Sequence, residues 1–307
     1  MPSLQHAVVS RLVGRLRPSP SLGDLDALRE QLVVANRTAH EGPPRGVRAG
    51  HQETIGNEHG FSVVSLWRQG DQGAAPGRAL FYVHGGAFVK PSDHRHWRFA
   101  TRVADALDAR AVLPLYPLAP EYTVHDCLES LADVFEEVAA ECPDGVVLAG
   151  DSAGGGLALA LAQELRDRGR ARACAQPGRL VLIAPWVDLT GTTPGTLEAA
   201  RDDPWLSYPH LAVYAAFWAG SADPDRLAHP RVSPLRGDLT GLPPCLVLCG
   251  TRDLLRPGCD ALFERADQAG WELEYVVAPG LVHVYPLLPI PEAGPAVESI
   301  VDFLRAR

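Results

Sequence analysis

The chain has 307 residues, of which 46% are hydrophobic and 21% are charged, a composition typical of folded globular proteins that excludes a disordered chain. A fold of this length buries roughly 75% of the surface of its unfolded chain, so it needs no disulfide or metal for stability. The formal net charge of −9 argues against a nucleic-acid-binding protein, because such proteins hold phosphates with a positively charged surface.

The first forty residues predict two helices joined at a proline-rich break. The first helix has one apolar face, made of Leu4, Val8, Val9, Leu12, Val13 and Leu16. Arginines flank that face, so binding at a membrane surface is one interpretation, but we favour a helix that packs on its own protein. Ser21 and Asp24 have the spacing of a capping box, which predicts that a second helix begins there.

From about residue 61, β-rich runs alternate with segments of helical periodicity. The predicted strands are Phe61–Trp67, Ala79–Val83, Ala111–Leu115, Gly145–Ala149, Leu180–Ala184, Cys245–Cys249 and Leu273–Val277. The predicted helices are Trp97–Leu107, Cys127–Ala140, Leu157–Arg168, Leu255–Gln268 and Ala296–Arg305. Several strands are continuously apolar, as parallel strands covered on both faces are. The alternation predicts an α/β protein with a doubly wound sheet.

One stretch interrupts this alternation. The segment from Trp186 to Asp238 contains no strand-like run. It holds the aromatic residues Trp186, Trp205, Tyr208, Tyr214, Phe217 and Trp218. Insertions of this kind often cover a binding site. We therefore expect a lid or cap, whose aromatic side chains either line a pocket or form the core of the cap itself.

The segment Gly150-Asp151-Ser152-Ala153-Gly154 lies between a predicted strand and a predicted helix. This is the context of a G-x-S-x-G nucleophile elbow, in which a sharp turn exposes the serine beside a base. Gly150 and Gly154 lack the side chains that would collide with the neighbouring backbone. The alternative is a glycine-rich turn that caps a helix or holds a phosphate, although the chain has no Gly-Lys-Ser/Thr of a P-loop.

A second run of small residues, His84-Gly85-Gly86-Ala87-Phe88, follows the predicted strand Ala79–Val83. Consecutive small residues leave backbone N–H groups free to face a ligand, as an oxyanion hole requires. The alternative is a tight turn without that role. We interpret His84 as a structural residue that holds the loop by a hydrogen bond, because it lies where the loop begins.

Asp253 and His283 each follow a predicted strand downstream of Ser152. The chain order Ser, Asp, His is that of α/β-hydrolases, in which the histidine takes the serine proton and the acid orients the imidazole. The competing candidates are Asp260 for the acid and His210 and His229 for the base. We favour Asp253 and His283 because the first competitor lies in a predicted helix and the two histidines lie in the cap segment.

These motifs belong to a longer series that runs from about Phe61 to the C-terminus. The series comprises His84-Gly85-Gly86, Tyr116-Pro117-Leu118-Ala119-Pro120-Glu121, Gly150-Asp151-Ser152-Ala153-Gly154-Gly155, Pro185-Trp186-Val187-Asp188-Leu189, Ser233-Pro234-Leu235 and the loops of Asp253 and His283. In this combination the sequence resembles the hormone-sensitive-lipase-like esterases, also called bacterial family IV or the α/β-hydrolase fold-3 group.

The resemblance implies a single α/β-hydrolase domain over 1–307, with an eight-stranded, mostly parallel sheet flanked by helices. It also implies a helical cap formed by about 1–45 and 186–238. The implied oxyanion hole draws on the amides of Gly85, Gly86, Ala87 and Ala153. Ala87 replaces the usual third glycine of the family and Val284-Tyr285 replaces the common Gly-Phe, so we expect the Ala87 methyl to narrow the pocket.

The expected function is hydrolysis of a short-chain acyl ester, an acetyl ester or a lactone through an acyl-enzyme on Ser152. The alternatives are an acyltransferase, a cyclase or another tailoring enzyme with the same triad, an amidase, and a binding protein on a hydrolase fold. We expect a small-molecule ester as substrate, no metal or organic cofactor, no nucleic acid, no stable membrane insertion and a cytoplasmic location. The six cysteines are expected to be free thiols, and a homodimer is left open.

Overall fold

Eight strands form one sheet in the part of the chain that the computed structural model describes, residues 2–16, 20–38, 42–57, 59–68 and 75–306. The strands are β1 (Gln52–Gly56), β2 (Val63–Trp67), β3 (Ala79–Val83), β4 (Arg110–Pro114), β5 (Val146–Asp151), β6 (Leu180–Ile183), β7 (Cys245–Arg252) and β8 (Leu273–Val282). Their order is β1-β2-β4-β3-β5-β6-β7-β8. The two pairings of β2 are antiparallel and the others are parallel, so the predicted eight-stranded, mostly parallel sheet is confirmed.

All seven predicted strands form, and the central ones are buried along their whole length, as their apolar runs require. The strand that the sequence did not predict is β1, which lies at the edge of the sheet and leaves most of its side chains in solvent. The sequence of β1, Gln52-Glu53-Thr54-Ile55-Gly56, has no apolar run. An edge strand that is this exposed buries little apolar surface.

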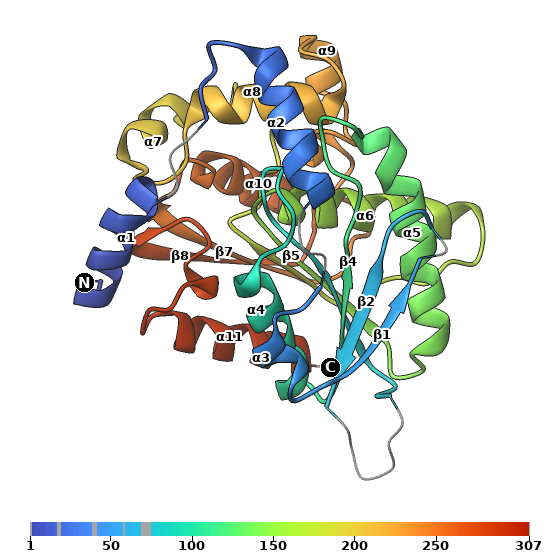
Figure 1. The fold of residues 1–307 in the computed structure, drawn as a ribbon. Coiled ribbons are helices and arrows are strands. Elements are labelled where there is room, and N and C mark those ends of the chain that lie inside the picture. The colour runs from blue at the N-terminus through green and yellow to red at the C-terminus, as the bar shows by residue number, and fades with distance from the viewer. Residues whose placement is uncertain (1, 17–19, 39–41, 58, 69–74, 307) are drawn as a thin grey trace.

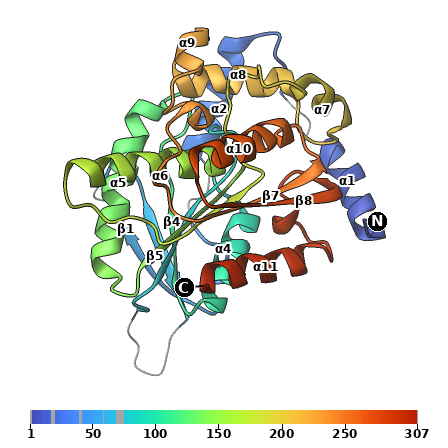
Figure 2. The same cartoon turned by 180° about the vertical axis from the view of Figure 1, so that it is seen from behind.

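Helices cover both faces of the sheet (Figures 1 and 2). On one face lie α4 (His94–Ala106) and α11 (Ala293–Arg305), and on the other lie α5 (Val124–Glu141), α6 (Ser152–Ala171) and α10 (Arg256–Ala269). The predicted helix at Leu157 begins earlier, at Ser152. The sequence pattern missed this first turn because it is Ser-Ala-Gly-Gly-Gly, which has neither apolar periodicity nor high helix propensity.

The segment after β6 contains helices and no strand among its described residues, as predicted. Here α7 (Thr196–Asp202), α8 (Tyr208–Ala219) and α9 (Pro224–Leu227) lie above the sheet, and α8 lies beside α2 (Leu25–Thr38) (Figure 1). The Nε2 atom of His210 lies 2.8 Å from the Pro20 carbonyl oxygen, so the insertion after β6 contacts the N-terminal segment. The short helices α3 (Arg45–Arg48), η1 (Pro234–Arg236) and η2 (Tyr285–Leu287) complete the described elements.

The first helix, α1 (Leu4–Leu16), differs from the prediction. Its apolar residues Leu4, Val8 and Leu12 are 87%, 56% and 43% exposed, whereas His6 and Ser10 are buried. The helix docks through polar contacts, such as the Ser3 hydroxyl donating to Glu292, and through Val9, which packs against the core. Part of the predicted apolar face is therefore exposed, and the side chains of Val13 and Leu16 lie outside the described part of the structure. None of the helices in the described part of the chain has the length and apolar character needed to cross a bilayer.

The second helix begins as expected, but its cap is Asp24 alone. The Asp24 carboxylate accepts hydrogen bonds from the amides of Asp26 and Ala27 at 3.1 and 3.0 Å. Ser21 instead accepts from the Gly23 amide, one turn before the helix. The spacing of a capping box was therefore present without its reciprocal hydrogen bonds.

Candidate active site

Ser152 stands at the junction of β5 and α6, in a turn that only this packing permits. Its φ of +53° is rare for a residue with a side chain, and such strained positions concentrate at functional sites. A Cβ on Gly150 would overlap the Gly154 carbonyl, and one on Gly154 would overlap the carbonyl oxygens of Val83 and His84. The two glycines therefore let β5, α6 and the loop after β3 approach closely enough to present the serine hydroxyl.

The structure brings Ser152, His283 and Asp253 together in one hydrogen-bonded series. His283 Nε2 lies 2.9 Å from Ser152 Oγ, and His283 Nδ1 lies 2.9 Å from Asp253 Oδ2. A carboxylate can only accept, so Nδ1–H donates to Asp253 and Nε2 is left to accept the Ser152 hydroxyl proton. This is the arrangement in which an imidazole can act as a general base toward a serine.

Burial and charge act in opposite directions on His283. Desolvation lowers the pKa of this buried imidazole, but the charge and hydrogen bond of Asp253 outweigh it, and the net pKa lies above the ordinary value. Asp203 and Asp151 raise the pKa further. The carboxylates around the ring therefore favour the imidazolium that forms when Ser152 loses its proton.

The loop after β3 contributes two backbone amides to the site. Gly86 and Ala87 line the same cavity as Ser152, and among the described residues their amides have no acceptor. Both have positive φ, +129° and +55°, which turns their N–H groups away from the strand ladder. Ala153 lies in the first turn of α6, where helical amides have no intrahelical partner.

The prediction for Gly85 is wrong. Its amide donates to Asp151 Oδ1 at 2.9 Å, and it does not line the cavity, so it is not available to an oxyanion. The buried Asp151 carboxylate also accepts from the Tyr82 hydroxyl at 2.6 Å. Burial would raise the pKa of Asp151, but His96, Tyr82 and the Gly85 amide outweigh it and lower the pKa. This anion therefore ties the loop after β3 to the elbow.

The structure confirms the interpretation of His84 as structural. Its Nδ1 lies 2.7 Å from the Gly85 carbonyl oxygen, and its ring stacks on Tyr116, whose hydroxyl donates to the His84 carbonyl oxygen at 2.9 Å. Burial and the neighbouring His96 lower the pKa of His84 to about 4. The imidazole is therefore neutral at pH 7 and holds the loop.

The three competing candidates lie elsewhere and are engaged in other contacts. Asp260 accepts from the Tyr275 hydroxyl at 2.7 Å on the outside of α10. His210 lies between Ser207 and Pro20 within the cap. His229 accepts from the Arg231 amide at 3.2 Å and contacts the ring of His125. The geometry therefore favours Asp253 and His283 over all three.

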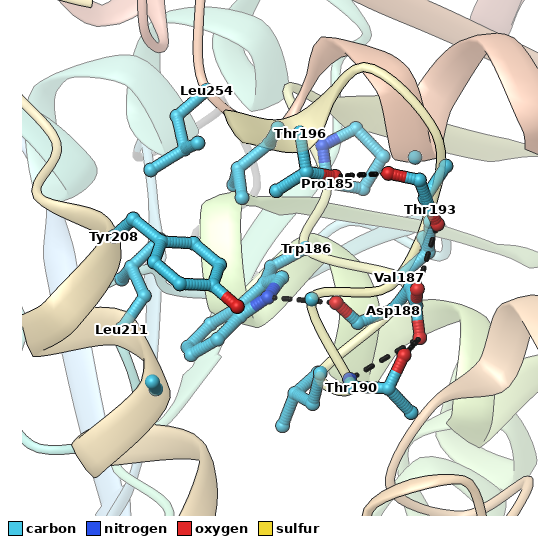
Figure 3. A pocket seen from close by; sticks show the side chains of 15 residues that line it. Pro185, Trp186, Val187, Asp188, Thr190, Thr193, Thr196, Tyr208, Leu211 and Leu254 are labelled. Carbon is cyan, nitrogen blue, oxygen red and sulfur yellow. Dashed lines mark hydrogen bonds between the residues drawn. The ribbon is translucent and has the colours of Figure 1, made fainter. Parts of the chain in front are cut away.

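Ser152 opens into a cavity of about 490 Å³ between the sheet and the cap. Next to it lies a smaller pocket of about 40 Å³, which shares Leu211 and Leu255 with the larger cavity (Figure 3). Trp186, Tyr208 and Leu254 point into the small pocket. Ser152 and His283 therefore face the larger cavity, and the small pocket adjoins it at Leu211 and Leu255.

Two residues that the sequence did not identify for the site approach it from the cap. The Trp205 ring lies 5.6 Å from the His283 ring, edge to face, and lines the cavity. Asp203 accepts a hydrogen bond from the Leu254 amide at 2.7 Å, one residue beyond Asp253. Trp205 was noted as one of several cap aromatics, but no sequence signal placed either residue at the triad, since both contacts join segments that are far apart in the chain.

Comparison with known proteins agrees with this geometry. A model of the alpha/beta hydrolase fold family matches residues 80–287. The LipR protein of Mycobacterium tuberculosis is 32% identical and covers 99% of this chain and 95% of its own length. An acetyl-hydrolase of Streptomyces hygroscopicus is 35% identical over 75% of this chain and 76% of its own.

The fold is equally well represented among solved structures. A crystal structure of an esterase from the bacterial hormone-sensitive lipase family superposes with a TM-score of 0.80 at 27% identity and covers 99% of both chains. The match extends over the cap as well as the sheet. The chain therefore belongs to the alpha/beta hydrolase fold family, among its hormone-sensitive-lipase-like esterases.

Proposed function

We propose that this protein hydrolyses carboxylic esters with a short acyl group through an acyl-enzyme on Ser152. The observation that carries the proposal is the continuous hydrogen-bonded series from Asp253 through His283 to Ser152, at the floor of an open cavity. Each member sits at the carboxyl end of a different strand of the same sheet, which is where α/β folds place their sites.

In the proposed first step, His283 Nε2 takes the proton of Ser152 as Oγ attacks the ester carbonyl carbon. The carbonyl oxygen becomes an oxyanion that accepts hydrogen bonds from the amides of Gly86, Ala87 and Ala153, each contributing about 3 kcal/mol to the barrier reduction. The carbon–oxygen bond to the alcohol then breaks, and His283 returns its proton to the leaving oxygen. Water repeats the sequence on the acyl-enzyme and releases the acid.

A short acyl group is supported by the space under the cap and by the relatives. The small pocket that adjoins the Ser152 cavity holds only about 40 Å³, and the side chains of Trp186, Tyr208 and Leu254 point into it (Figure 3). Pockets for larger ligands usually span several hundred Å³. The relative from Streptomyces hygroscopicus is named an acetyl-hydrolase. We therefore expect acetyl and similarly small esters to react fastest.

The proposal includes one catalytic domain with a cap made of about 1–45 and 186–238. Support for this division comes from the contact between the His210 ring and Pro20, and from the Arg29 guanidinium, 5.1 Å above the Phe217 ring. Both contacts join the N-terminal segment to the insertion. The two segments would then move as one lid over the sheet.

We also propose a cytoplasmic location and a homodimer. The cysteines support the location, because all six are free thiols and five are buried, a state that reducing compartments preserve.

Support for a dimer comes from the β8 edge of the sheet, where Val276 and the neighbouring Phe263 of α10 are partly exposed. The molar mass in solution, measured by light scattering, tests the dimer.

The deciding experiment replaces the nucleophile. Ser152→Ala is expected to abolish hydrolysis of p-nitrophenyl acetate while leaving the circular dichroism spectrum unchanged, because the hydroxyl is lost and the turn is kept. Ser299→Ala, on the exposed side of α11, is the matched control and is expected to retain full activity. Turnover by the Ser152→Ala protein would contradict the proposal.

A covalent probe tests the same site without relying on a chosen substrate. A fluorophosphonate is expected to label the wild-type protein at Ser152, as shown by mass spectrometry of the modified peptide. The products formed in the presence of an alcohol then separate hydrolysis from acyl transfer. A free acid as the main product supports the hydrolase, whereas a new ester as the main product would identify a transferase.

A further inference from the structure

One half-buried carboxylate of the cap, Asp203, contacts the catalytic core. Asp203 follows α7, and its Oδ1 accepts hydrogen bonds from the amides of Trp205 and Leu206 at 2.7 and 2.9 Å. Its Oδ2 accepts from the Leu254 amide at 2.7 Å. A single carboxylate therefore satisfies three backbone donors, two on the cap and one on the core loop that begins with Asp253.

The turn that Asp203 holds is the part of the cap that touches the catalytic base. The Trp205 ring lies edge to face against the His283 ring, with centroids 5.6 Å apart. On its other side the Arg95 guanidinium lies 5.4 Å from the Trp205 ring, and Arg95 is paired with Asp93. The position of Trp205, and through it the packing of His283, thus depends on the turn that Asp203 closes.

Asp203 also acts on the triad through its charge. Burial and the nearby Asp253 carboxylate raise the pKa of Asp203 to about 6. His283 and the hydrogen bonds from the amides of Leu206 and Leu254 lower this pKa, but they offset the rise only in part. In return, the charge of Asp203 adds to that of Asp253 in raising the pKa of His283, and Asp151 contributes from the elbow side. Above pH 6 the imidazole therefore lies among three carboxylates.

We propose that Asp203 is a positioning residue for ester hydrolysis, which ties the cap turn to the loop of Asp253 and keeps His283 basic through its negative charge. The inference rests on the proposed function, since it concerns the base of that mechanism. Asp203 does not reach the substrate cavity and acts only through Trp205, Leu254 and the electrostatic field on His283.

A second cap carboxylate separates this role from ordinary turn capping. Asp223 accepts hydrogen bonds from the amides of Asp225 and Arg226 at the start of α9, as Asp203 does from Trp205 and Leu206. Asp223 is exposed and has no contact with a core loop among the described residues. What distinguishes Asp203 is its half-buried position near Asp253 and its hydrogen bond from the Leu254 amide.

The test compares Asp203→Asn with Asp223→Asn in p-nitrophenyl acetate hydrolysis over the pH range 4.5–9. Asp203→Asn removes the charge and leaves the side chain one oxygen for three amide donors. We expect kcat to fall about tenfold or more, because small displacements in an active site have effects of this size, with KM changing far less. The acid limb of kcat/KM is expected to move to lower pH by about half a unit to one unit.

Asp223→Asn is expected to keep the wild-type kcat and the wild-type position of the acid limb in the pH profile of kcat/KM. If the Asp203→Asn protein does not fold, Asp203→Ser provides a second neutral variant. The serine hydroxyl can still accept a hydrogen bond from the cap amides. This variant should show the same shift of the limb. A wild-type limb in a folded neutral variant would overturn the proposal, even if thermal stability falls.

The outcomes also separate this inference from the proposed function. If Ser152→Ala is inactive and the neutral Asp203 variants keep the wild-type profile, only the role of Asp203 fails. If Ser152→Ala retains turnover, the proposed function itself fails. The low-field proton resonance of His283 Nδ1 gives an independent reading, and its titration midpoint should fall in Asp203→Asn.

Discussion

Two regions meet at His283, and they are held in different ways. On the core side, the elbow packs Ser152 between β5 and α6 through backbone contacts that leave no room for a Cβ at Gly150 or Gly154. On the cap side, the turn from Asp203 to Leu206 approaches the same imidazole and is held by three hydrogen bonds to one carboxylate.

The two kinds of support, backbone packing on the core side and polar contacts on the cap side, suit two different tasks of the site. Backbone packing tolerates almost no change, which suits atoms that must stay within tenths of an ångström of the reacting bond. A turn held by a few polar contacts can vary in sequence and can open without disturbing the sheet. We infer that chemistry resides on the rigid side and that substrate access and tuning reside on the cap side.

The largest expected effect tests the rigid side. Gly154→Ala places a methyl group against the carbonyl oxygens of Val83 and His84, and we expect the free energy of unfolding to fall by about 3 kcal/mol or more, with loss of activity. Chemical denaturation and the rate of ester hydrolysis measure both effects.

The matched control for that change is Gly294→Ala. Gly294 also lies in the first turn of a helix, α11, but a Cβ there meets no atom within 4 Å. We expect it to stabilise the protein by about 0.5–1 kcal/mol, because it only removes backbone freedom from the unfolded chain. If the two substitutions had similar effects, the packing argument for the elbow would be wrong.

The pH dependence of activity comes next in size. His283 must be neutral to accept the Ser152 proton, and its pKa lies above the ordinary value of 6.5. Activity is therefore expected to be lost as the pH falls through that raised pKa, about tenfold for each further pH unit. A kcat/KM profile measured between pH 5 and 9 shows the limb. A profile that stays flat across neutral pH would argue against His283 as the base.

A smaller effect is expected from the cap side. Trp205→Ala removes a ring that packs against His283 and lines the cavity, and it leaves the residues of the elbow unchanged. We expect kcat/KM for p-nitrophenyl acetate to fall about tenfold with a nearly unchanged melting temperature, because the ring is only partly buried.

Tyr122→Ala is the control for the loss of an aromatic side chain, because Tyr122 is 46% exposed and does not line the catalytic cavity. It is expected to have wild-type kinetics. Equal activity of the two variants would show that the cap turn does not tune the base, and the contrast between the two regions would then disappear.

Most of the core could be predicted from the sequence, because its signals are local. Short β-rich runs, several of them continuously apolar, identified seven of the eight strands, and the short motifs around Ser152, Asp253 and His283 each lie next to a strand end. Parallel strands bring their carboxyl ends to one edge of the sheet, so residues far apart in the chain could be expected to meet there. The polar edge strand β1 was missed because it buries too little to leave a pattern.

The sequence by itself determined the fold class and singled out Ser152, Asp253 and His283 as the proposed triad, since each of these signals lies in a few adjacent residues. Only the tertiary structure decided that the Gly85 amide donates to Asp151, that Leu4, Val8 and Leu12 of α1 stay exposed, and that Asp203 lies near Asp253. In each case the outcome depends on which distant atom occupies the neighbouring space. Hydrogen bonding and burial between separate segments leave no periodic trace in a chain, and they are settled only when the segments pack.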